Sequence, residues 1–505
     1  MKQPNILFLF TDQFRFDAIA ALGNPVIKTP VLDTLVSEGV TFQNAFTACP
    51  VCVPARFALH SGKMPHRTGV FENHKIPDGH RSFMSCLSDG GYQTHGVGKM
   101  HFTFGSGPNT LWGFDSRSSN EGPKEENDFY QNAKKNGFGD VTDSSGVRSE
   151  MYYIPQLSPL PAELHHSAWS VDASLDYIAN RDQDKPFFLM TSFTKPHPPF
   201  APPQPWNKLY RGPDMPLPKV PDSSETLMTL WNRFQNRYKY RDQGKDLNLI
   251  RQMIAYYYAE ISFIDYQLGR LFDQLKQDGL YDDTVIIFSS DHGEFLGDYD
   301  CYGKRSFLDA SARVPLIMKY PGCAAGSTCT TPVTLVDIMP TLIELGNAAG
   351  EEGLSGESLV GIAEGKSERT TAFGQYEQQG YANYMAVDED YKYIYSAPDE
   401  MEYLFDRNTD PDETRNKASN PLYVEKTAEM RQRLIDYFKA EGYTDPLDGD
   451  GWKLYGKKEM PADPDAYLLF QDPPESIPNI PGYETDGNAK RYFNFQWYER
   501  RYDKV

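Results

Sequence analysis

The sequence of 505 residues has no long hydrophobic run. No apolar stretch approaches the ~20 residues that a membrane-spanning helix needs, so we expect no membrane partner. The first apolar stretch, Ile6–Phe10, is too short for the core of a signal peptide and is typical of a buried strand. As written, the chain predicts a cytoplasmic protein, or a periplasmic or secreted one if a signal peptide has been trimmed from it.

Positive charge is also scarce. The chain has 50 Lys and Arg residues against 70 Asp and Glu residues, which gives a formal net charge of -20. Such a charge disfavours non-specific binding to nucleic acid or to anionic membranes, and no run of Lys and Arg interrupts it. We therefore expect no nucleic-acid partner, although a basic pocket can lie within an acidic surface.

The six cysteines are too few for a disulfide-stapled scaffold in a chain of this length. A local bridge is easy to imagine only between Cys323 and Cys329. Cys49 and Cys52 form a Cys-x-x-Cys pair, which by itself is typical of a thioredoxin-like dithiol or of half a zinc site. Neither interpretation fits, because there is no second such pair and the chain lacks the small βαβ context of a thioredoxin. Taken alone, Cys52 could equally be a buried, inert cysteine.

Short β-rich apolar runs alternate with helical patterns over the first two thirds of the chain. The runs are Ile6–Phe10, Thr94–Gly98, Phe187–Ser192, Val285–Ser289 and Val314–Lys319, and the helical patterns include Ala168–Asn180 and Leu247–Gln277. This alternation predicts an α/β fold with a large, mostly parallel sheet sandwiched by helices. Because the length exceeds what one core usually supports, a smaller companion domain is expected.

After a helix-like stretch at Thr334–Leu345, the composition becomes rich in Gly and Glu around Gly350–Lys366, which we interpret as the inter-domain connection. Three short strands and one helix are expected beyond it, at Tyr384–Val387, Lys392–Tyr395, Tyr403–Asp406 and Pro421–Phe438. The prediction is a catalytic domain over 1–365 and a C-terminal α+β subdomain with an antiparallel sheet over 366–505. Its Pro- and aromatic-rich tail from about 460 could wrap the body or contact another subunit, so a homo-oligomer stays open.

Polar motifs follow four of the expected parallel strands. They are Thr11-Asp12-Gln13, Gly98-Lys99-Met100-His101, Lys195-Pro196-His197 and Ser290-Asp291-His292. Ligands of open α/β sheets collect beyond the carboxyl ends of the strands, so these motifs predict a shared site.

A helix is expected directly after Cys52. Pro54 suits its first position and Gly62 suits its C-cap, which would place Cys52 at a helix N-terminus, where an anion is stabilised.

The pattern Cys52-x-Pro54-x-Arg56 is the one that a formylglycine-generating enzyme recognises in the sulfatase family. The chain resembles the formylglycine-dependent (type I) sulfatases of the alkaline-phosphatase-like superfamily in seven segments in family order. These are Asn5–Asp12, Pro30–Phe46, Cys52–Gly62, Gly98–His101, Lys195–Phe200, Ser290–Gly293 and Glu402–Asn416. The resemblance implies hydrolysis of a sulfate monoester of a sugar, aryl alcohol or small alcohol through a formylglycine-sulfate intermediate, and a maturase that oxidises Cys52.

The resemblance also implies the metal site. Asp12, Asp291 and His292 would hold one divalent cation beside Cys52, with Gln13 as a further candidate. Ca²⁺ is expected first from the family, while the imidazole also suits Mn²⁺, Zn²⁺ or Fe²⁺.

The remaining roles follow the same resemblance. Lys99 would bind the formylglycine diol and a sulfate oxygen, His101 would be the base that releases sulfate, and Arg56 would brace the deprotonated diol. His197 and Lys304 would reach the bridging oxygen and protonate the leaving group. The expected substrate-binding residues are Asn73, Lys99, His197, Lys304 and Arg305, and His74 could join Asn73 at the pocket mouth.

Two departures from the family pattern keep alternatives open. Many sulfatases have a second Asp where this chain has Gln13, and many have Asn where it has His292. Phosphonate monoester and phosphodiester hydrolases of the superfamily share the Asp-Gln start and the Asp-His pair, while choline sulfatases resemble the run from Pro54 to Asn73. A catalytically silent binding homologue is a third hypothesis, against which the intact motif set argues. The alcohol depends on loops such as Gly107–Ser158 and Ala201–Asp246, which the motifs do not specify.

Overall fold

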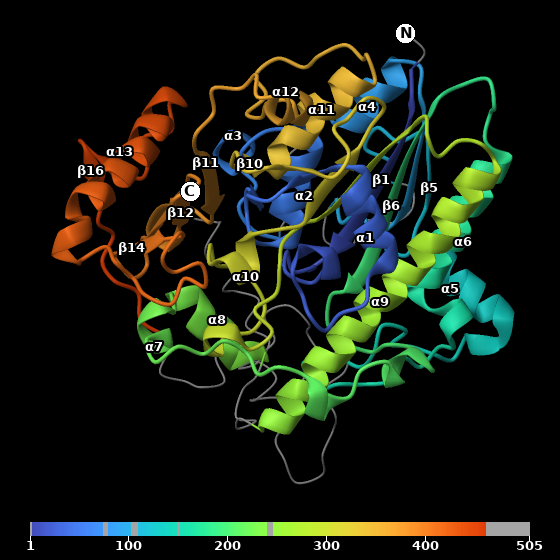
Figure 1. Ribbon diagram of the computed structural model, residues 1–505, viewed down its shortest axis with the longest axis horizontal. Coiled ribbons are helices and arrows are strands. Elements are labelled where there is room, and N and C mark those ends of the chain that lie inside the picture. Colours follow the sequence, from blue (N-terminus) through green and yellow to red (C-terminus); the bar gives the residue numbers. More distant parts are fainter. Residues whose placement is uncertain (1–2, 74–78, 103–109, 149–151, 240–245, 461–505) are drawn as a thin grey trace.

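The computed structural model describes residues 3–73, 79–102, 110–148, 152–239 and 246–460, and its elements are arranged as a large α/β domain with a smaller sheet at one side (Figure 1). The strands are β1 (Asn5–Asp12), β2 (Val40–Phe42), β3 (Ala45–Phe46), β4 (Gln93–Gly98), β5 (Ser116–Ser118), β6 (Phe187–Pro196), β7 (Thr284–Ser290), β8 (Leu316–Lys319), β9 (Ser327–Cys329), β10 (Val333–Thr334), β11 (Ala372–Tyr376), β12 (Asn383–Val387), β13 (Tyr391–Ser396), β14 (Met401–Asp406), β15 (Leu447–Asp448) and β16 (Gly451–Trp452). The helices are α1 (Pro30–Glu38), α2 (Cys52–Ser61), α3 (Pro65–Thr68), α4 (Phe83–Asp89), α5 (Asp128–Ala133), α6 (His166–Asn180), α7 (Ser224–Leu227), α8 (Leu230–Lys239), α9 (Leu247–Gln277), α10 (Asp309–Ala312), α11 (Ile338–Leu345), α12 (Leu359–Ala363) and α13 (Val424–Ala440).

The large sheet has eight strands in the order β5-β4-β6-β1-β7-β8-β2-β9. The strands from β5 to β7 are all parallel, and β8 is antiparallel to both of its neighbours. This confirms the predicted α/β class with a mostly parallel sheet. The antiparallel direction of β8 was beyond the prediction, because an apolar run carries no information on strand direction.

Helices cover both faces of this sheet (Figure 1). Alternate residues of β1 point to opposite faces, as the pleat requires. Leu7 and Leu9 join a core with side chains of α6 and α9, whereas Phe8 and Phe10 join a second core with side chains of α4 and α11. Because β1 is buried on both faces, its sequence is a continuous apolar run.

The smaller sheet is antiparallel, in the order β11-β12-β13-β14, and α13 packs against one of its faces through Leu434 and Phe438. The stretch 350–366 precedes this sheet but is not a free linker, since it contains α12, whose Leu359 is buried in the core of the large domain. The boundary at 365 remains a prediction, and the tail from 461 onward lies outside the described residues.

All six cysteines are free, so the structure does not contain the disulfide considered between Cys323 and Cys329. Among the helices of the described ranges, none has the length and apolar character that a bilayer crossing requires.

Candidate functional site

Helix α2 places Cys52 at its first position, with Val51 as N-cap and Gly62 as a left-handed C-cap. The predicted helix is confirmed, but Pro54 lies at its third position and not at its first. A proline fits there because first-turn N–H groups have no acceptor within the helix. Val51 supplies no side-chain cap, and Asn73 instead accepts a hydrogen bond from the Val53 N–H at 3.0 Å.

The strand ends converge on Cys52. Asp12 ends β1, and Asp291 and His292 follow β7, the strand that pairs with β1. One ligand atom from each of Asp12, Cys52, Asp291 and His292 lies within 4.8 Å of all the others, and all four residues are buried. The structure therefore brings together four of the five predicted metal ligands, through residues far apart in the sequence.

The Cys52 thiol is surrounded by cationic and polar groups. Lys304 Nζ donates to Cys52 Sγ at 2.8 Å, and His292 Nε2 lies 3.3 Å from the same atom. Burial opposes ionisation of Cys52, but the positive charges of Lys304 and Lys99 outweigh it and hold the thiol pKa well below its ordinary value. An anion at position 52 is thus stabilised by its surroundings.

Arg56 connects the two carboxylates of the cluster. Its Nε donates to Asp291 at 3.0 Å and its Nη2 to Asp12 at 3.2 Å, while Nη1 donates to the Lys99 carbonyl at 2.7 Å. Burial and the Cys52 charge oppose ionisation of Asp12, yet Lys99, His197 and Arg56 lower its pKa. For Asp291 the balance is opposite, because burial, together with the nearby Asp12, raises its pKa. Arg56 thus donates to both carboxylates, and its expected role in bracing the diol remains a prediction.

The two histidines expected at the reacting centre lie near residue 52. His101 helps to lower the pKa of the Cys52 thiol, and Cys52 opposes the lowering of the His197 pKa that burial causes. His101 has a left-handed backbone (φ 53°), and its N–H is fixed by Glu121 at 2.9 Å. His197 Nδ1 lies 2.7 Å from the Pro198 carbonyl, which requires the proton on Nδ1. Its Nε2, 3.4 Å from the Tyr152 hydroxyl, is then the acceptor nitrogen.

Gln13 and Lys304 contact each other beside the cluster. Lys304 Nζ donates to Gln13 Oε1 at 3.0 Å, and the Gln13 N–H donates to Asp291 at 3.0 Å. The Gln13 amide nitrogen donates to Glu294, a fully buried carboxylate that the sequence reasoning missed. Glu294 could have been predicted from its position two residues after His292, just beyond the carboxyl end of the same strand.

The other predicted substrate-binding residues are engaged elsewhere. Arg305 donates to Glu72 at 3.0 and 3.2 Å and to the Tyr376 hydroxyl at 2.9 Å, and its side chain is buried at the contact with the smaller sheet. Asn73 caps α2, as described above. His74 lies outside the described residues. Substrate binding by Asn73 and Arg305 remains a prediction.

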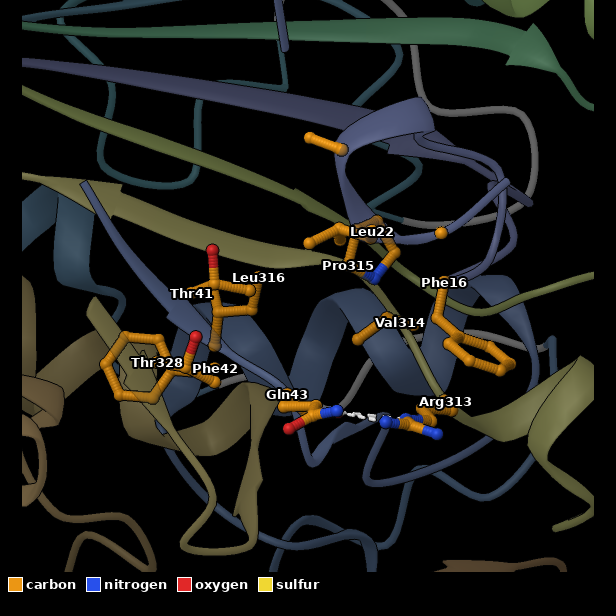
Figure 2. Close-up of a pocket in the computed structure, with 12 residues that line it drawn as sticks. Phe16, Leu22, Thr41, Phe42, Gln43, Arg313, Val314, Pro315, Leu316 and Thr328 are labelled. Carbon is orange, nitrogen blue, oxygen red and sulfur yellow. Dashed lines mark hydrogen bonds between the residues drawn. The ribbon is translucent and has the colours of Figure 1, made fainter. Parts of the chain in front are cut away.

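A pocket of about 480 Å³ opens elsewhere on the large domain, near β2 and β8 (Figure 2). Arg313 donates across it to the Gln43 carbonyl and also pairs with Asp309 at 3.1 Å. None of the predicted site residues lines it.

Comparisons with known proteins agree with this architecture. The sequence profile of the sulfatase family matches residues 4–348, and that of the N-sulphoglucosamine sulphohydrolase C-terminal domain matches residues 297–440. The arylsulfatase of Clostridium perfringens is 29% identical, over 88% of this chain and 96% of the relative. The choline-sulfatase of Rhizobium meliloti is also 29% identical, over 83% of each chain.

Among solved structures, the phosphonate monoester hydrolase of Agrobacterium radiobacter superposes with a TM-score of 0.76 at 25% identity, over 87% of this chain and 96% of that chain. Fold, site and profile match lead to one assignment: the chain belongs to the sulfatase family, a family of sulfuric ester hydrolases.

Proposed function

We propose that the protein hydrolyses a sulfate monoester, with residue 52 as a formylglycine nucleophile. The observation that carries the proposal is the position of residue 52 at the N-terminus of α2, in contact with Lys304 and beside Lys99, Asp12, Asp291 and His292. A sulfate monoester carries dispersed negative charge that repels nucleophiles, so its hydrolysis needs fixed positive charge around the sulfate oxygens. The cluster offers that charge in a buried setting, where it acts most strongly.

The donor set fits a divalent cation. Asp12 and Asp291 offer carboxylate oxygens and His292 an imidazole, while residue 52, as a hydrated aldehyde, would offer oxygen where Cys52 Sγ now stands. Ca²⁺ is the first candidate by family, and the imidazole makes Mn²⁺ the second. A bound divalent ion would stabilise negative charge on the nucleophile and on a sulfate oxygen.

The protein's own groups fill the remaining roles. Lys99 contacts Asp12 at 2.5 Å and would bind a sulfate oxygen, while His101, which lies near residue 52 and helps to lower the Cys52 pKa, would be the base for sulfate release. A hydrated formylglycine supplies one hydroxyl for attack and a second for release of the sulfate.

Protonation of the leaving alcohol is assigned to Lys304. Its ammonium already donates to Sγ, whereas the His197 proton is held on Nδ1 by the Pro198 carbonyl. His197 Nε2 would therefore orient the substrate beside the Tyr152 hydroxyl.

The related chains give the candidate alcohols. An arylsulfatase, a choline-sulfatase and an N-acetylglucosamine-6-O-sulfatase are among the relatives, so aryl, choline and sugar sulfates form the first substrate panel. Release of free sulfate from each would identify the alcohol.

Phosphonate monoester hydrolysis is the second candidate, supported by the likeness to the Agrobacterium radiobacter enzyme and by Gln13 in place of a second carboxylate. Turnover of an aryl sulfate and of an aryl phosphonate monoester should be compared on one metal-loaded sample. We expect the sulfate to be favoured, and a dominant phosphonate rate would reverse the assignment.

The nucleophile is tested by mass spectrometry of the peptide that contains Cys52, from protein produced with a maturase. We expect loss of sulfur and two hydrogens and gain of one oxygen at residue 52. Cys52→Ala should lower kcat by roughly 10³-fold or more, as for other removed nucleophiles. Cys49→Ala, three residues away, is the matched control and should keep its activity. Full activity from a protein whose residue 52 is an unmodified thiol would exclude the mechanism.

A further inference from the structure

The side-chain amide of Gln13 lies between two groups of opposite hydrogen-bonding character. On one side is the Lys304 ammonium, which can only donate, 3.0 Å from Gln13 Oε1. On the other side is the Glu294 carboxylate, which accepts from Gln13 Nε2. Exchanging the oxygen and nitrogen of the amide would set donor against donor at Lys304 and acceptor against acceptor at Glu294. The amide therefore has one satisfied orientation.

Glu294 is itself held firmly. Its Oε1 accepts from the N–H groups of Leu296 at 2.8 Å and Gly303 at 2.7 Å, and its Oε2 accepts from the Tyr153 hydroxyl at 2.7 Å. The side chain is fully buried. Gly303 directly precedes Lys304, so the same carboxylate ties down the segment that carries the proposed proton donor.

The geometry points to Glu294 as a positioning residue that keeps the Gln13 oxygen turned towards the metal-binding cluster. This inference rests on the proposed metal at Asp12, Cys52, Asp291 and His292. Gln13 Oε1 shares the Lys304 ammonium with Cys52 Sγ, which places the oxygen on the cluster side of the amide. Gln13 thus offers the metal-binding cluster an uncharged oxygen ligand. The carboxylate of Glu294 lies behind Gln13, one side chain further from the cluster.

Replacing Glu294 with glutamine should reverse the amide. In Glu294→Gln, two backbone N–H groups retain the new side-chain oxygen at the Oε1 position, so the new NH₂ faces Gln13. The Gln13 amide must then rotate so that its oxygen accepts from the new NH₂ group. The NH₂ group of Gln13 then faces the cluster, where it repels both a metal cation and the Lys304 ammonium. Loss of such an orienting partner typically lowers metal affinity by about 10- to 100-fold.

The measurement is calorimetric titration of the chelator-stripped, formylglycine-containing enzyme with Mn²⁺ alone, so that no substrate enters. Tyr153→Phe is the control. It removes the hydrogen bond from the Tyr153 hydroxyl to Glu294 and the weaker 3.4 Å hydrogen bond that this hydroxyl accepts from Gln13 Nε2, but it keeps the carboxylate and its own contact with Gln13. We expect near wild-type affinity. The double variant Glu294→Gln/Gln13→Glu places an acceptor-only group beside the new NH₂ and next to Lys304. It should recover most of the lost affinity.

The outcomes distinguish the proposed metal site from the proposed role of Glu294. If wild type binds neither Mn²⁺ nor Ca²⁺, both the metal site and the role of Glu294 are overturned. If wild type binds and Glu294→Gln binds equally well, only the inference is overturned. It is equally overturned if Tyr153→Phe loses as much affinity as Glu294→Gln, or if the double variant binds no better than the single one. Should Glu294→Gln not fold, the double variant carries the test, since it keeps one carboxylate and one amide in the same space.

Discussion

Two buried clusters of charged side chains serve different ends in this molecule. At the contact between the domains, Lys392 of β13 contacts Asp309 and lies 2.6 Å from Glu413, so opposite charges compensate each other. Around Cys52, Arg56 is paired with both carboxylates, but the Lys304 ammonium contacts a thiol and an amide oxygen. At the domain contact, the buried cation and carboxylates pair with each other and hold the two domains together. Around Cys52, the cationic charge is only partly paired and can therefore bind an anion.

The largest effect is expected at Lys304. Lys304→Ala should lower kcat for an alkyl sulfate by about 10²- to 10⁴-fold, the usual contribution of a proton donor, and by less for an aryl sulfate, whose leaving group needs less help. In the formylglycine enzyme, where residue 52 carries no ionisable thiol, the free energy of unfolding should stay unchanged or rise, because a buried cation without an anionic partner is removed. Steady-state kinetics on both substrates and urea unfolding measure the two quantities.

The exposed Lys219, which pairs with Asp412 at the surface, gives the control variant Lys219→Ala, for which we expect no change in either quantity. Equal losses of Lys304→Ala on both substrates would remove Lys304 from leaving-group protonation.

The inter-domain cluster should behave in the opposite way. Lys392→Met leaves Asp309 and Glu413 buried without their shared cation, which typically costs about 3 to 5 kcal/mol of unfolding free energy. The kcat of the folded fraction should remain near that of wild type, because Lys392 contacts no site residue in the part of the chain that the structure describes. A variant of unchanged stability but lost activity would contradict the contrast between the clusters.

The smallest effect concerns pH. Burial, reinforced by the Asp309 charge and opposed by Lys392, raises the pKa of Glu413 from an ordinary 4.5 to about 7. A raised pKa contributes stability that is full below pH 4.5 and is lost as pH rises through about 7. Glu413→Gln removes this titration. As pH rises from 4.5 to about 7, the unfolding free energy of the variant should therefore increase relative to that of wild type by roughly 1 to 3 kcal/mol.

Urea unfolding of both proteins at several pH values from 4.5 to 8 measures the difference. A difference that does not vary with pH would place the Glu413 pKa at its ordinary value. Asp309, whose pKa Lys392 lowers against the effect of burial, acts with the opposite sign, and its contribution is lost only as pH falls below 3.8.

Much of the site could be predicted from the sequence because it follows from strand order. Asp12, Lys99, His197 and Asp291 each lie at the carboxyl end of a parallel strand, and parallel strands bring these ends to one edge of the sheet. Helix α2 was also predictable, since a proline and a glycine mark its first turn and its end.

The remainder depends on contacts between distant residues. Gln13 and Glu294 are 281 positions apart, and Arg305 and Glu72 are 233 apart, so no local pattern reveals either pair. Hydrophobic periodicity likewise gives no strand direction, which is why the reversal of β8 was missed. Side-chain partners in a buried polar site are set by packing, and packing is a property of the whole chain.

Every residue of α2, from Cys52 to Ser61, is buried, and Cys52 is only 2% exposed. The proposed maturase, which would recognise Cys52, Pro54 and Arg56, could not reach them once α2 is buried against α11. The proposed conversion of Cys52 therefore belongs to biosynthesis, on extended chain, before the fold closes. Protein that folds with a thiol at position 52 would keep it, and adding the maturase afterwards would not restore activity unless the chain were first unfolded.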